Sequence, residues 1–168
     1  MAVFYYPEDA SRLSLALVSF MGPMNGPFMG SLFIILRSFN LTKQIIYFFL
    51  ISLILTGILY IGNFFGFVFI ISMILFLILI LQTNEIFQIF FVDMLGTQIA
   101  IGIYHDLEYL FTYQVEGMNG KMMLSDTGSI QQVLILPHWF WASFMLFIAT
   151  FLLISSLILS FNRSKEEF

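Results

Sequence analysis

The fold is decided by an uncharged segment, residues 44–84, with the sequence QIIYFFLISLILTGILYIGNFFGFVFIISMILFLILILQTN. Its apolar part, residues 45–81, would form a continuous helix about 55 Å long at 1.5 Å per residue, whereas the hydrocarbon core of a bilayer is only about 30 Å thick. The segment must therefore contain two membrane-spanning helices. The break falls at Tyr60-Ile61-Gly62-Asn63, because Gly and Asn are poor residues for a helix interior. We expect a tight turn, bend or bulge there.

The composition of the whole chain supports a membrane location. Hydrophobic residues make up 60% of the 168 residues and charged residues only 10%, whereas about 25% of the residues in soluble domains are charged. With about 20 residues for each crossing, the chain has room for four or five spans. We predict an all-α fold, a polytopic transmembrane helical bundle of about five spans in a single membrane domain, residues 1–168.

The predicted spans follow from the apolar stretches, and they cover residues 13–36, 45–61, 64–82, 86–104 and 137–161. Pro23 and Pro27 interrupt the first of them, which predicts a kinked span or two half-helices. Residues 105–132 form a polar connection outside the hydrocarbon. Trp139 and Trp141 at the start of the last span are typical of the membrane interface.

Several classes of function are excluded by the polar residues. Ten acids against six bases leave no basic stripe, so we expect no nucleic-acid partner. The absence of Cys excludes thiolate metal sites and Fe–S ligation by this chain. The two histidines, His105 and His138, fall in separate connections, so we predict no metal site, no bound cofactor and no catalytic residue. His138 is expected to be an interfacial anchor, and His105 a loop residue or a proton entry point beside Asp106.

Asp93 is the strongest candidate for a proton relay. It is the carboxylate expected at membrane depth, where an acid costs several kcal/mol unless it is paired, hydrated or protonated. The alternative is that residues 86–104 lie at the interface with Asp93 in water. Glu85 is a second relay candidate, or else a helix cap among the headgroups. Arg37 is most simply a surface base beside Lys43, and alternatively an intramembrane arginine facing a proton path.

A family resemblance comes from two short motifs. Tyr60-Ile61-Gly62 lies within the apolar run, and GPMNGPFMGSL at residues 22–32 lies about 35 residues upstream. This pattern resembles subunit 6 of the NADH:ubiquinone oxidoreductase, respiratory complex I, in a divergent form. The resemblance implies a membrane-arm subunit that helps couple quinone reduction to proton transfer. It also implies a helix bulge at Tyr60, Ile61, Gly62 and Asn63, with Tyr60 as a further proton-relay candidate.

The same resemblance implies the partners. They would be other membrane subunits of a large respiratory complex, and those subunits would bind NADH, flavin, Fe–S clusters and quinone. Lipids such as cardiolipin would be further partners, with a lipid bound to this chain. The implied location is the mitochondrial inner membrane, as a multi-pass and organelle-encoded protein. The 22 Phe residues agree with an AT-rich organelle genome. No import signal is visible, because Glu8 and Asp9 precede the first base, Arg12.

Two other hypotheses stay open. The chain could be the proton-channel subunit of ATP synthase, in which Arg37 would be essential. It could also be a structural subunit of a respiratory complex with no chemistry of its own.

Overall fold

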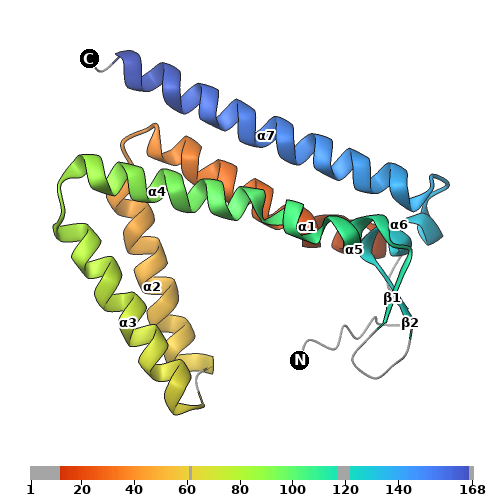
Figure 1. Cartoon of the computed structure of the whole chain (residues 1–168), viewed down its shortest axis with the longest axis horizontal. Coiled ribbons are helices and arrows are strands. Elements are labelled where there is room, and N and C mark those ends of the chain that lie inside the picture. Colours follow the sequence, from red (N-terminus) through yellow and green to blue (C-terminus); the bar gives the residue numbers. More distant parts are fainter. Residues whose placement is uncertain (1–11, 61, 117–121, 167–168) are drawn as a thin grey trace. The chain divides into compact units, whose positions relative to one another are not determined.

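The structure, a computed structural model, describes residues 12–60, 62–116 and 122–166 (Figure 1). Five of its helices are long and apolar enough to cross a membrane by length and composition: Leu13–Arg37, Thr42–Tyr60, Phe64–Gln82, Glu85–Phe111 and His138–Arg163. This confirms the predicted all-α, polytopic bundle of about five spans and a multi-pass membrane protein.

The elements follow one another in a simple order. They are α1 (Arg12–Arg37), α2 (Thr42–Tyr60), α3 (Phe64–Gln82), α4 (Glu85–Ala100), the 3-10 helix η1 (Ile101–Asp106), α5 (Leu107–Phe111), β1 (Gln114–Glu116), β2 (Met122–Leu124), α6 (Asp126–Val133) and α7 (His138–Glu166). The two strands pair antiparallel, with Val115 opposite Met123. Pro23 and Pro27 lie inside α1, which continues as one helix from Arg12 to Arg37.

Polar side chains form hydrogen bonds with backbone groups at the ends of the hairpin helices, because lipid cannot satisfy these groups. The Asn63 side chain caps α3 by accepting a hydrogen bond from the Gly66 N–H at 2.7 Å. The Gln88 side chain in α4 donates to the carbonyls of Leu81 and Thr83, both at 3.0 Å, and so binds the end of α3. At the predicted bulge, α2 ends at Tyr60 and α3 begins at Phe64, while Ile61 lies outside the described residues.

The chain divides into two compact units. Unit 1 comprises residues 1–29 and 99–153, and unit 2 comprises residues 30–98 and 154–168. The core of unit 1 joins α1, η1, α5, α6 and α7 through Met24, Ile103, Leu110, Ile130, Ala142, Met145 and Ala149. Ser125 caps α6 by accepting from the Gly128 N–H at 3.0 Å, and its hydroxyl donates to the Thr112 carbonyl. Ser125 thus connects the start of α6 to the C-terminal end of α5.

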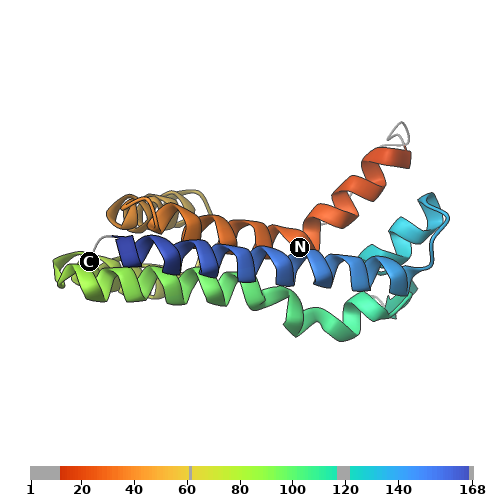
Figure 2. The ribbon, with the colours of Figure 1, turned by 90° about the horizontal axis from the view of Figure 1, so that it is seen from above.

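In unit 2, the C-terminal half of α1 packs closely against α4. A Cβ atom at Gly96 would lie 2.9 Å from Ile34 Cγ1 and 3.0 Å from the Gly30 carbonyl oxygen. Only a residue without a side chain allows this approach. Figures 1 and 2 show these two segments running alongside the C-terminal part of α7, while α2 and α3 form a hairpin of their own.

Candidate functional site

The most informative site is an ion pair in unit 2. Arg37, the last residue of α1, places its Nη2 atom 2.8 Å from Oδ2 of Asp93 in α4. The Arg37 Nη1 group donates a hydrogen bond to the hydroxyl of Ser160 in α7 at 3.0 Å. Arg37 is 15% exposed and Asp93 30% exposed at the side chain. We call Arg37, Asp93 and Ser160 the ion-pair site.

The ion-pair site lies within the membrane-spanning part of the chain. Asp93 follows Glu85, the start of its span, by about 12 Å along the helix axis at 1.5 Å per residue. Ionised side chains at such positions are expensive unless they are paired, and they mark functional sites in many membrane proteins. The two charges tolerate this environment because each neutralises the other.

Part of the hydrogen-bonding capacity of the pair is unused. Arg37 Nε, a donor, and Asp93 Oδ1, an acceptor, are buried and have no hydrogen-bond partner among the described residues. The pair therefore leaves one N–H group and one carboxylate oxygen unpaired within the part of the chain that the structure describes.

The other predicted relay and bulge residues lie at helix ends. Glu85 is exposed in the first turn of α4, where a negative charge is favoured by the helix dipole. Tyr60 is 81% exposed at the end of α2, and Gly62 and Asn63 are exposed beside it. The structure thus brings together Arg37 and Asp93, which the sequence offered only as separate candidates.

Ser160 was missed by the sequence analysis. A serine in an apolar helix gives little signal, because it often bonds only to its own backbone. The available signal was its spacing from Ser156, since residues four apart share one helix face and both are buried.

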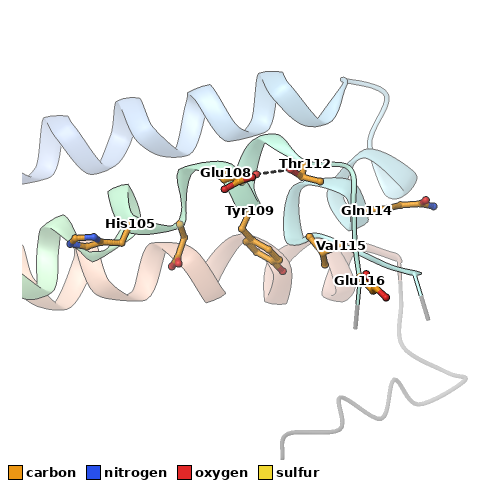
Figure 3. Close-up of a pocket in the computed structure, with 8 residues that line it drawn as sticks. His105, Glu108, Tyr109, Thr112, Gln114, Val115 and Glu116 are labelled. Carbon is orange, nitrogen blue, oxygen red and sulfur yellow. Dashed lines mark hydrogen bonds between the residues drawn. The ribbon is translucent and has the colours of Figure 1, made fainter. Parts of the chain in front are cut away.

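A second polar feature is an open pocket in unit 1 with a volume of about 450 Å³. Figure 3 shows side chains from η1, α5 and β1 around it, and the lining residues are His105, Asp106, Glu108, Tyr109, Thr112, Gln114, Val115 and Glu116. Three of these residues are acids. We call this feature the acidic pocket.

Asp126 lies next to Tyr109, which lines the acidic pocket. Burial raises the pKa of the Asp126 carboxyl, and a hydrogen bond with the Tyr109 side chain opposes the rise. The Asp126 N–H also donates to the Tyr109 hydroxyl at 3.2 Å. The Asp126 carboxyl is thus a half-buried group of unit 1 whose pKa is raised.

The two histidines occupy different environments in unit 1. His138 binds Gln131, whose Oε1 atom accepts from the His138 backbone N–H at 2.7 Å and lies 3.0 Å from ring Nδ1. His105 is exposed at the acidic pocket. The His138 ring thus has a local partner in α6.

Comparison with known proteins gives one match. A family model described as Peptidase M50B-like matches residues 5–156. No curated protein and no solved structure matches the chain.

The family match corrects the functional predictions. The resemblance to complex I subunit 6 is wrong, and so are the predicted respiratory function in quinone-coupled proton transfer and the predicted partner subunits of a respiratory complex. The ATP synthase and structural-subunit hypotheses gain no support from the match either. The error has a physical cause. Lipid restricts spans to apolar residues with a few Gly, Pro and Tyr, so short motifs of these residues recur in unrelated bundles.

The residues of this chain do not fit the zinc site of a membrane metalloprotease. Such sites need three protein ligands, and zinc peptidases commonly supply two of them from a His-Glu-x-x-His helix. This sequence contains no such motif, no Cys and only two histidines. Among the described residues, no group of three or more His, Cys, Asp or Glu side chains could hold a metal ion. We therefore derive no zinc-dependent step for this chain.

Proposed function

Because the chain belongs to the Peptidase M50B-like family, we propose that it acts on polypeptides inside the bilayer, binding a membrane-spanning segment of another protein without hydrolysing it. The observation that carries this proposal is the ion-pair site, whose Arg37 Nε and Asp93 Oδ1 atoms are buried without partners among the described residues.

The chemistry of the site suits a peptide group. Each peptide unit presents one carbonyl acceptor and one N–H donor. These match the free donor of Arg37 and the free acceptor of Asp93. A backbone group left unpaired in hydrocarbon costs several kcal/mol. A bound segment with an irregular turn would therefore gain partners at this site.

Photo-cross-linking tests the proposal. The chain is reconstituted in lipid vesicles with a single-span polypeptide that carries a photoreactive residue at mid-span. We expect cross-links with the native chain and a marked loss with Arg37→Lys, which keeps the positive charge but lacks the Nε–H group. Lys43→Gln is the matched control, since Lys43 is an exposed base of the same unit. Equal cross-linking in Arg37→Lys, or cleavage fragments of the polypeptide, would contradict the proposal.

Proton transfer is a second candidate function, favoured by a carboxylate held in the membrane-spanning part of α4. In this hypothesis Asp93 carries the proton, and Glu85 and Tyr60 remain the other predicted relay residues. The test is proton flux into vesicles that contain a pH-sensitive dye. Asp93→Asn should abolish the flux, Glu85→Gln and Tyr60→Phe should lower it, and an unchanged flux in Asp93→Asn would exclude the relay.

The membrane that holds the chain is also a proposal. We propose the mitochondrial inner membrane and an organelle gene, which the 22 Phe residues support. We expect synthesis of the chain to continue when cytosolic ribosomes are inhibited and to stop when organellar ribosomes are inhibited.

A further inference from the structure

The six Lys and Arg residues are unevenly distributed between the two ends of the spans. Because successive spans alternate in direction, the α1–α2 connection, the α3–α4 connection and the C-terminus of α7 emerge on the same side of the membrane. The bases there are Arg37, Lys43, Arg163 and Lys165, and we call this region the basic end. In the sequence, the other two bases are Arg12, which precedes the first span, and Lys121, which falls between the fourth and fifth spans.

Contacts within unit 2 gather the basic end into one surface. The guanidinium of Arg163 lies over the ring of Phe39, 3.9 Å from its centroid, and Arg37 binds Ser160 one helical turn before Arg163. The last turns of α7 are thus held beside the α1–α2 connection. Lys43 is exposed in the first turn of α2, and Phe39 and Arg163 are exposed as well.

Acids are present at both ends but concentrate at the opposite one. The basic end includes Glu85, and Glu166 and Glu167 follow in the sequence. The opposite end contains Asp126 and the three acids of the acidic pocket, as well as Glu8 and Asp9 in the sequence. Membrane orientation follows the number of Lys and Arg residues near span ends, and acids contribute little to it.

We propose that the basic end is an interaction surface for the phosphate groups of anionic lipids in the leaflet that faces the compartment of synthesis. Lys43 and Arg163 supply charges that pair with phosphate, and the ring of Phe39 lies under the Arg163 guanidinium. Three spans separate Lys43 from Gln114, so these two positions are expected on opposite sides of the membrane.

The orientation is tested with single cysteines, since the native chain has none. Gln44→Cys and Gln82→Cys report on the basic end, and Gln114→Cys and Gln132→Cys are the matched positions at the opposite end; all four glutamines are exposed. A membrane-impermeant maleimide should label the first pair only from the compartment of synthesis and the second pair only from the other side. The reverse pattern, or labelling of any variant from both sides, would overturn the orientation.

The lipid contact is tested with the full chain in nanodiscs. The midpoint of thermal unfolding should be higher in phosphatidylglycerol-containing discs than in phosphatidylcholine discs. The rise should disappear in Lys43→Gln/Arg163→Gln and persist in Lys43→Arg/Arg163→Lys. Inorganic phosphate added to phosphatidylcholine discs should not reproduce the rise. A rise with inorganic phosphate would assign the surface to free phosphate, and equal midpoints in the two lipids would exclude a phosphate contact.

Discussion

At the scale of single residues, the ion pair between Arg37 and Asp93 is the feature that most constrains function. Each residue alone would carry an uncompensated charge into the membrane-spanning part of the chain. Together, at 2.8 Å, they are tolerated and still leave one donor and one acceptor without a partner in the part of the chain that the structure describes. The pair therefore has a structural role and a chemical capacity at the same time.

Removing one member of the pair should be more damaging than removing both charges. Asp93→Ala or Arg37→Ala should destabilise the fold by about 3–5 kcal/mol, because the remaining charge stays buried without a partner. Arg37→Gln/Asp93→Asn should recover most of this loss. Unfolding in mixed micelles with increasing denaturing detergent measures the difference. A double variant as unstable as the sum of the single variants would show that the charges are not coupled.

The pH dependence of unit 1 should reflect Asp126. Burial raises the pKa of its carboxyl in the folded state, so folding favours the protonated acid. Its favourable contribution is present at low pH and is lost as the pH rises through the folded pKa. Asp126→Asn should therefore be more stable than the native chain at neutral pH, with a difference that shrinks on acidification towards the unperturbed pKa of 3.8. Thermal unfolding across this pH range measures it, and a difference that is independent of pH would contradict the assignment.

At the scale of elements, helix ends and close helix contacts explain how so apolar a chain holds one arrangement. Four consecutive helices are joined by short connections, and side chains of Asn63 and Gln88 satisfy the backbone groups at two of these connections. Gly96 brings α1 and α4 close enough for Arg37 to reach Asp93. Small residues at a helix interface have this role in many membrane bundles.

The contribution of the α3 N-cap to the free energy of unfolding should be measurable by itself. Asn63→Ala should lower the free energy of unfolding by about 1 kcal/mol, because the Gly66 N–H loses its acceptor. Asn63→Asp keeps an acceptor oxygen and should retain most of the stability. Denaturant titration of the three chains in micelles compares them, and equal losses in Ala and Asp variants would show that the cap is not the cause.

The close contact between α1 and α4 should not accept a methyl group. Gly96→Ala would place Cβ 2.9 Å from Ile34 Cγ1 and 3.0 Å from a backbone oxygen of Gly30, so the helices must separate, at about 1–3 kcal/mol. Gly102→Ala is the control, because a Cβ atom there meets nothing within 4 Å. We expect the Gly96 variant alone to lose stability in micelles. If the ion-pair site depends on this contact, the variant should also show a smaller proton flux or a lower cross-linking yield.

At the scale of the whole molecule, family membership and chemistry point in different directions. The match to the Peptidase M50B-like model covers residues 5–156, yet the sequence has no His-Glu-x-x-His motif and the described residues contain no group of His, Asp and Glu side chains that could hold a metal ion. A fold can be kept while the chemistry at its site changes. We therefore propose binding of membrane-spanning polypeptides, without hydrolysis, as the function of this residue set.

Metal analysis tests this conclusion on the purified chain. We expect far less than one zinc ion per chain and no change in thermal stability or in polypeptide cross-linking after treatment with a chelator. Stoichiometric zinc that resists dialysis would contradict it, since it would require ligands outside the set described above.

The sequence by itself determined that this protein lies in a lipid bilayer and how many spans it has. Lipid admits only helices or closed barrels, so an uncharged run too long for one crossing had to divide, and Gly62-Asn63 was its weakest point. Sequence motifs led to the wrong family, because short patterns of Gly, Pro and Tyr are common in apolar helices. Tertiary structure decided which polar residues meet. Arg37, Asp93 and Ser160 lie on three different helices, and their contact depends on how those helices pack, which no local pattern of residues encodes.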